Sequence, residues 1–165
     1  MDQRIDYGKV APEGVRALSG LEAYVRRSGL EPGLVDLVKT RASQLNRCAY
    51  CIDMHTKDAR AAGETEQRLY ALSAWRETPF YTDRERAALA WTDAVTLISD
   101  ASVPDDLYEE ARRQFSEKEL VDLTLALVAI NAWNRLGISF RTVPGTYQPK
   151  ARAAAGTESP KGAGG

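Results

Sequence analysis

Residues Cys48 to His55 read Cys-Ala-Tyr-Cys-Ile-Asp-Met-His and contain both cysteines and the only histidine of the 165-residue chain. Residues three or four apart are neighbours on an α-helix, so Cys48, Cys51 and His55 are predicted to share one helix face. A disulfide needs Cα atoms about 4.4–6.8 Å apart, and positions three apart on a helix meet that condition. The spacing therefore predicts a cysteine pair that opens and closes with little backbone motion.

The cluster is predicted to lie at the start of a helix. Asn46 and Arg47 interrupt the preceding helical pattern, which leaves Cys48 near the next helix N-terminus. The partial positive charge there stabilises a thiolate. We expect Cys48 to lie nearer to solvent than Cys51, and His55 to accept a proton from Cys51 directly or through one water.

Three other interpretations of the cluster have to be weighed. The cysteines could be small buried apolar residues, but burial explains neither their spacing nor His55. Structural zinc needs four ligands, and the motif supplies three, so Asp36 or a neighbouring subunit would have to add the fourth. A permanent disulfide is disfavoured in a reducing compartment. A redox-active pair is the leading interpretation, and we expect no metal and no cofactor.

The rest of the chain is patterned as helices, which predicts an all-α protein. Pro12 and Pro32 are placed to begin two helices, Gly29 and Gly63 to end two, and the last long helix is expected to end at Gly137. Capping boxes are predicted at Thr82–Glu85 and Ser116–Glu119, and shorter helices at about 64–75 and 104–115. Only residues 138–141 could form a strand.

Composition places most of the chain in one soluble domain. With 44% apolar and 27% charged residues and a net charge of -1, the chain lacks the basic surface that nucleic acid or anionic membranes require. No uninterrupted apolar run approaches the roughly 20 residues of a membrane span. Because residues 1–6 are too polar for a signal peptide, we expect a cytoplasmic protein. Residues 1–150 are predicted to form the domain, and residues 151–165, rich in Ala and Gly, a disordered tail.

The motif Cys-x-x-Cys-x-x-x-His, embedded in residues 43–60, resembles the alkylhydroperoxidase D-like (AhpD-like) proteins of the carboxymuconolactone decarboxylase superfamily. The resemblance is strongest over residues 34–69 and continues more weakly through Arg84–Trp91 and Asn131–Arg135. It implies an AhpD-like helical bundle that assembles into a homo-oligomer, a trimer or hexamer. It also implies a thiol-dependent peroxidase or disulfide reductase.

The resemblance also implies a role for each site residue. Cys51 matches the peroxidatic cysteine, Cys48 the resolving cysteine, and His55 the histidine of the proton relay. Asp36 occupies the position, twelve residues before Cys48, where the family has a relay Glu, and its side chain is one methylene shorter. Tyr50 stands where the best-known members have His. The implied partners are a peroxide substrate and a dithiol reductant, either a lipoyl domain or a thioredoxin-like protein.

Two further functions remain open at this point. The superfamily includes decarboxylases of carboxylated lactones, which do not depend on a CxxC pair, and a non-catalytic oligomeric redox sensor would use Cys48–Cys51 as a switch. Outside the motif, the three tryptophans are expected to be core or interface anchors. A structural role, such as a subunit contact, is favoured over pocket lining for Asn131, Asn134 and Arg135.

Overall fold

The computed structural model describes residues 2–149, and the predicted tail at 151–165 lies outside this range. The described residues are helical and include no strand, which confirms the all-α prediction. In chain order the elements are α1 Tyr7–Val10, α2 Pro12–Arg26, α3 Pro32–Leu45, α4 Ala49–Ala61, α5 Glu66–Ala71, the 3-10 helix η1 Leu72–Glu77, α6 Asp83–Thr96, α7 Asp105–Gln114 and α8 Glu117–Phe140.

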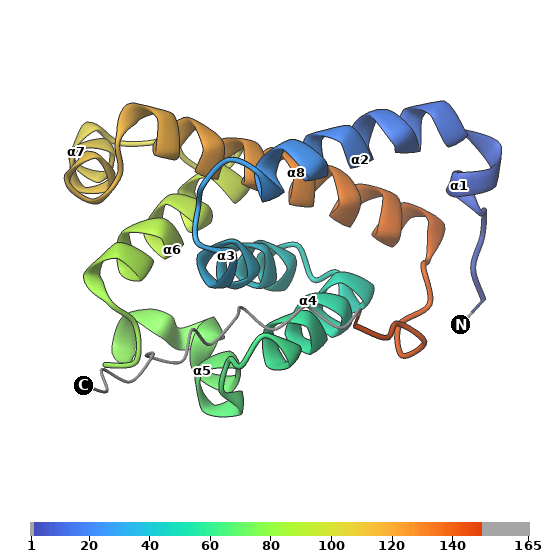
Figure 1. Cartoon of the computed structure of the whole chain (residues 1–165), viewed down its shortest axis with the longest axis horizontal. Helices are drawn as coiled ribbons and strands as arrows, with labels where there is room; N and C mark the ends of the chain where they lie inside the picture. The colour runs from blue at the N-terminus through green and yellow to red at the C-terminus, as the bar shows by residue number, and fades with distance from the viewer. Residues whose placement is uncertain (1, 150–165) are drawn as a thin grey trace, which may run out of the picture.

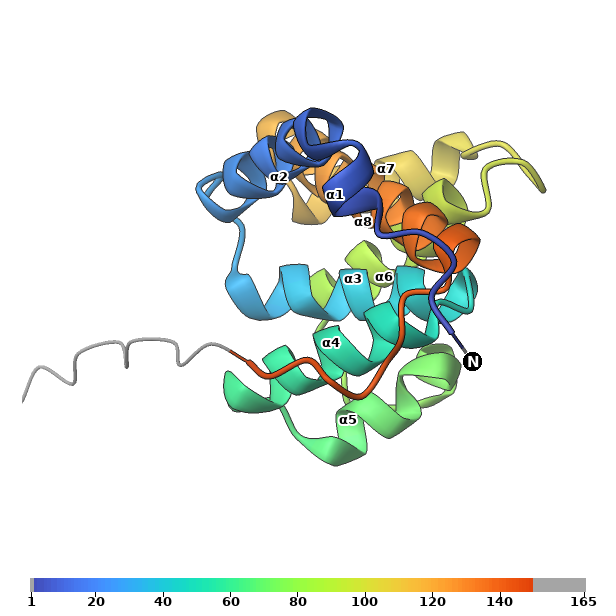
Figure 2. The same ribbon diagram turned by 90° about the vertical axis from the view of Figure 1, so that its right-hand side faces the viewer.

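The helices are stacked in three layers with α3 at the centre (Figures 1 and 2). Helix α3 packs against α4, α6 and α8, and α2 lies along α8. Figure 2 shows α1, α2 and α8 on one side of α3 and α6, with α4 and α5 on the other. The segment after α8 returns along α4, so the C-terminal end of the described chain lies beside the cysteine-bearing helix.

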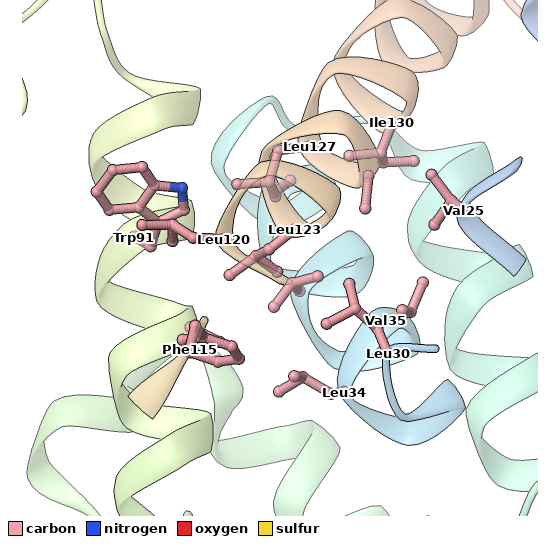
Figure 3. Packing of buried hydrophobic residues seen from close by; sticks show 14 of the residues in the cluster. Val25, Leu30, Leu34, Val35, Trp91, Phe115, Leu120, Leu123, Leu127 and Ile130 are labelled. Atoms are coloured by element: carbon pink, nitrogen blue, oxygen red, sulfur yellow. The ribbon is translucent and has the colours of Figure 1, made fainter. Parts of the chain in front are cut away.

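The main core forms where α8 packs between α2, α3 and α6. Leu123, Leu127 and Ile130 of α8 are fully buried and lie between Trp91 on one side and Val25 on the other (Figure 3). The indole N–H of Trp91 donates to Thr124 Oγ1 at 3.0 Å, so its polar atom is satisfied. Because truncating a buried leucine typically costs about 2–5 kcal/mol, this seam fixes α8 firmly above α3.

Both predicted capping boxes are present. The hydroxyl of Thr82 accepts from the backbone N–H of Glu85, while the Glu85 carboxylate accepts from the Thr82 backbone. Ser116 and Glu119 make the same reciprocal pair at the start of α8. Each box satisfies two N–H groups that the first turn of a helix leaves open.

Three predicted details of the helices are wrong. The helix expected over 64–75 is a short α5 followed by η1, with Ala74 outside helical geometry. Helix α8 does not end at Gly137 and continues to Phe140, so most of the stretch considered as a strand is helical. The helix ends instead because Arg141 adopts the left-handed conformation, at φ 54°. The last turn is held by Phe140, whose ring contacts Tyr7 and whose carbonyl accepts from the Arg4 backbone N–H at 2.9 Å.

Helix α8 is, by length and composition alone, apolar enough to cross a membrane, although polar residues interrupt its apolar runs. It packs against α2, α3, α4, α6 and α7, as the central helix of a globular protein does. Only 39% of its most apolar window is buried, however. Val121 and Val128, two turns apart, remain about half exposed on its outer face.

Candidate active site

The connection between α3 and α4 places the first cysteine at a helix start. Asn46 ends α3, Arg47 takes the left-handed conformation at φ 58°, and Cys48 is the N-cap of α4. For a residue with a Cβ this conformation costs roughly 1–2 kcal/mol. Two backbone hydrogen bonds hold the turn, from Cys48 N–H to Ser43 C=O at 3.0 Å and from Ile52 N–H to Cys48 C=O at 2.9 Å. The predicted helix break is therefore confirmed, and it aims Cys48 at the first turn of α4.

The two cysteines are free thiols whose sulfur atoms lie 2.7 Å apart. Both side chains are buried, Cys48 at 1% and Cys51 at 2% exposure. The expectation that Cys48 is nearer to solvent is wrong, because the end of α8 covers it. Cys51 lines a cavity whose wall does not include Cys48.

The two thiols differ in pKa. The pKa of the Cys48 thiol is lowered to about 7, chiefly because of its hydrogen bond with Cys51, with further help from the backbone N–H groups of Cys51 and Tyr50. The same contact, together with burial, raises the pKa of Cys51. Near neutral pH the reduced pair therefore favours a thiolate on Cys48, at the start of α4, and a protonated thiol on Cys51.

The cavity beside Cys51 has a volume of about 620 Å³ and lies between α2, α3 and α4. Its wall is partly apolar, with Val25, Leu30, Val35 and Met54, and partly aromatic, with Tyr7, Tyr50, Trp133 and Tyr147. The volume falls in the range typical of sites for small organic molecules. Cys51 is thus placed where a bound molecule can reach its sulfur.

His55 lines the same cavity, one turn beyond Cys51. Its ring is 7% exposed, and within the described chain neither Nδ1 nor Nε2 has a hydrogen-bond partner. Burial and the nearby charge of Lys39 lower the pKa of His55 to about 3, so the ring is neutral at pH 7. The predicted direct proton transfer from Cys51 has no hydrogen bond to support it here. A neutral imidazole can instead accept from and donate to a molecule in the cavity.

Asp36 reaches this cavity from α3. Its side chain is buried, at 8% exposure, and it lines the wall together with Cys51 and His55. Three of the four predicted site residues, Asp36, Cys51 and His55, therefore line one cavity. The fourth, Cys48, contacts Cys51 from outside the cavity wall.

A charged pair in the wall, Lys39 with Glu22, was not predicted. Lys39 of α3 is buried and hydrogen-bonds to Glu22 of α2 across the cavity. Its spacing could have indicated this position, since Lys39 follows the inward-facing Val35 by four residues on the same helix. The segment after α8 adds Tyr147, whose hydroxyl donates to Asp58 Oδ1 at 2.7 Å. No local pattern in the sequence signals that contact.

Helix α8 closes the side of the pair that faces away from the cavity. Asn134 is fully buried inside the chain, so the subunit contact favoured for it is wrong, and its Nδ2 donates to Ser43 Oγ at 3.1 Å. Asn131 joins the same network through Asn46, whereas Arg135 is exposed. Trp75 and Trp91 are core residues, as predicted, while Trp133 lines the cavity.

The described residues contain no cluster of three or more His, Cys, Asp or Glu side chains arranged to hold a metal ion. Cys48, Cys51 and His55 therefore do not form a ready ligand set, because zinc would need further donors. What the arrangement does provide is a dithiol at the wall of a cavity, beside a buried neutral imidazole.

Comparisons with known proteins identify the family and the fold of the chain. Residues 12–94 match the model of the carboxymuconolactone decarboxylase family. The chain is 47% identical over 139 residues to the uncharacterized protein YdfG of Bacillus subtilis, spanning 84% of this chain and 95% of that protein. It is 46% identical to ATU0492 of Agrobacterium tumefaciens, a protein of unknown function suggested to be the antioxidant defence protein AhpD, with a TM-score of 0.86 over 88% of this chain and all of that one.

A more distant structure shares the fold alone. The debrominase Bmp8, as a variant in complex with 2,3,4-tribromopyrrole, has a TM-score of 0.75 at 19% identity, covering 84% of this chain and 74% of that one. The family model, which matches half of the chain, is sufficient to assign the family. This chain belongs to the carboxymuconolactone decarboxylase family and has its AhpD-like helical fold.

Proposed function

We propose that the protein is a thiol-dependent peroxidase that uses Cys48 and Cys51 as a redox-active pair. The observation that carries this proposal is the position of Cys51, whose sulfur lies 2.7 Å from Cys48 and on the wall of a cavity of about 620 Å³. A substrate in that cavity meets Cys51 first, and the resolving thiol is already in contact. The family assignment and the likeness to ATU0492 support a peroxidase-related function.

The reaction proceeds in two steps. The shared proton moves from Cys51 to Cys48, and the Cys51 thiolate attacks the terminal oxygen of ROOH, breaking the O–O bond and forming a sulfenic acid and an alkoxide. The alkoxide takes one proton and leaves as ROH. The Cys48 sulfur then loses its proton and attacks the Cys51 sulfenic acid, forming the disulfide and releasing hydroxide, which is protonated to water. The dithiol supplies both electrons, and one net proton comes from solvent.

The proton route involves His55 and Asp36 through the cavity. His55 is neutral and its two ring nitrogens are unsatisfied in the described chain, so it can pass a proton by accepting at one nitrogen and donating at the other. A water between His55 and Cys51 would complete the path, because no direct hydrogen bond links them. Asp36, in the same wall, is the carboxylate at the end of this route.

Turnover requires an external dithiol to reopen the disulfide, and a lipoyl domain or a thioredoxin-like protein has the chemistry to do so. We further propose that the protein works in the cytoplasm as a homo-oligomer, a trimer or hexamer. The half-exposed Val121 and Val128 on α8 support the assembly, since a second copy would remove them from water.

Mass spectrometry of the peroxide-treated protein, combined with a peroxide-consumption assay, tests the proposal. We expect a mass loss of two hydrogens per chain at a rate that matches peroxide loss, and recovery of both with a dithiol such as dihydrolipoamide. Complete disulfide formation with negligible turnover would instead indicate a redox sensor. Carbon dioxide release from a carboxylated lactone by protein lacking both thiols would indicate a decarboxylase.

A further inference from the structure

We propose that Asn134 is the thiolate-stabilising residue of this site: its buried side-chain amide, held in one orientation by Asn46 and Ser43, donates a hydrogen bond to the Cys48–Cys51 pair from α8. This inference rests on the proposed function for its purpose, but it concerns the chemistry of the two sulfurs and can be measured without any peroxide.

The orientation of the Asn134 amide follows from its neighbours. Asn46 Nδ2 donates to Asn134 Oδ1 at 2.8 Å, and Asn134 Nδ2 donates to Ser43 Oγ at 3.1 Å. Because the oxygen is occupied by a donor, a flipped amide would place two N–H groups against each other. The amide nitrogen, and not the oxygen, is therefore the end of the side chain that can donate toward a sulfur, and Asn134 lowers the pKa of both thiols.

The backbone around the pair supports the same arrangement. Ser43, which anchors the Asn134 amide, also accepts the Cys48 backbone N–H through its carbonyl, at 3.0 Å. Gly137, three residues beyond Asn134, carries no side chain, so α8 approaches the sulfurs closely enough for the amide to reach them. A single buried network thus links the α3 end, the α4 start and α8 at the reacting atoms.

Asn134 is an uncharged group that does not titrate. The titratable or charged groups that line the cavity beside the pair lie on α1, α2, α3 and α4 and in the segment after α8: Tyr7, Glu22, Arg26, Asp36, Lys39, Tyr50, His55, Asp58 and Tyr147. From α8 the sulfurs face Asn134 and Gly137, neither of which titrates. The Asn134 amide is neutral and is held by Asn46 and Ser43, so it can donate to a thiolate at every pH. It adds no further titratable group to the site.

The test is a pH titration of the thiolate ultraviolet absorbance in the reduced protein. Removing one hydrogen bond to a charged group costs about 1.5–3 kcal/mol, and about 1.36 kcal/mol corresponds to one pH unit, so Asn134→Ala should raise the thiolate midpoint by about one to two pH units. Asn134→Asp keeps the shape, lacks the donor and should raise the midpoint at least as far. Asn131→Ala removes an amide from the same helix and network that has no sulfur contact, and should leave the midpoint unchanged.

An unchanged midpoint in folded Asn134→Ala and Asn134→Asp would overturn the inference, as would an equal shift in Asn131→Ala. If both Asn134 variants fail to fold by circular dichroism, Asn46→Ala decides the matter. That change keeps Asn134 but releases its orientation, so a smaller rise is expected and no rise overturns the proposal. A wild-type protein that forms thiolate normally yet consumes no peroxide would refute the proposed function and leave the role of Asn134 intact.

Discussion

Gly137 on α8 and Cys48 at the start of α4 lie so close that a Cβ atom at position 137 would stand 3.3 Å from Cys48 Sγ and 3.8 Å from Cys51 Sγ. The first distance is tighter than ordinary van der Waals contact, so a side chain there would displace the sulfur. The absence of a side chain at Gly137 therefore leaves space for the Cys48 sulfur, although the backbone there is ordinary helix.

Gly137→Ala should slow the closure of the Cys48–Cys51 disulfide, because the added methyl group moves the Cys48 sulfur out of line with Cys51. Stopped-flow kinetics with peroxide measure this rate. Helix propensity favours alanine by about 1 kcal/mol, which offsets part of the crowding, so the free energy of unfolding should change little. Gly20→Ala on α2 is the matched control, since nothing lies within 4 Å of its Cβ position, and it should raise stability without altering closure. Equal closure rates in the two variants would contradict the steric argument.

The two cysteines should give different products when each is replaced by serine. Cys51→Ser removes the sulfur that lines the cavity and should abolish peroxide consumption. Cys48→Ser should leave a Cys51 that oxidises once and accumulates sulfenic or higher acids. Trapping of sulfenic acid followed by mass spectrometry distinguishes these outcomes. If the first oxidation step were lost equally in both variants, the assigned order of attack would be incorrect.

Acid should destabilise the protein in part through His55. Its pKa is about 3 when folded and 6.5 in the unfolded chain, so the unfolded state binds a proton first as the pH falls below 6.5. Stability from this group is therefore present above pH 6.5 and is lost progressively toward pH 3. The difference between pH 7 and pH 5 is about 2 kcal/mol.

Urea unfolding at both pH values measures this loss, with His55→Gln as the comparison, because glutamine keeps a polar side chain that does not titrate. The variant should lose about 2 kcal/mol less than the wild type between pH 7 and pH 5. Identical losses in the two proteins would show that His55 is already protonated or solvated in the folded state.

Asp36→Asn keeps the shape of the side chain but removes the proton acceptor. General acid–base groups contribute ~10²–10⁴-fold, and after allowing for an indirect role we expect at least a tenfold fall in the Cys51 oxidation rate near neutral pH. Asp36→Glu restores the residue usual in the family and should retain activity. Stopped-flow kinetics across pH compare the two. A wild-type rate in Asp36→Asn would mean that His55 works without this carboxylate.

The outer face of α8 should mediate assembly. Light scattering is expected to report a mass well above that of an 18.2 kDa monomer. Replacing half-exposed Val121 and Val128 together by glutamate should reduce that mass, because each buried charge in the interface would lack a partner. Val10→Glu, on an equally apolar but isolated residue of α1, is the control and should leave the mass unchanged. A stable wild-type monomer at micromolar concentration would refute the proposed assembly.

The sequence alone determined the features that depend on local interactions, namely where the helices begin and which side chains share a helix face. Helix starts at Pro12, Pro32, Thr82 and Ser116 follow from backbone donors that need a partner or a missing N–H, and these contacts lie within one turn. The cluster around Cys51 could also be predicted from the sequence, because three-residue and four-residue spacings fix which side chains are neighbours on a helix.

Only the tertiary structure decided what surrounds that cluster. Asn134 and Gly137 reach the sulfurs from a distant part of the chain, Lys39 pairs with Glu22 across the cavity, and Cys48 is covered rather than exposed. The end of α8 illustrates the reason: Gly137 was expected to stop the helix on local grounds, but packing against Cys48 keeps it helical, and Arg141 adopts the left-handed turn instead. Contacts between distant segments depend on how helices stack, which local spacing does not encode.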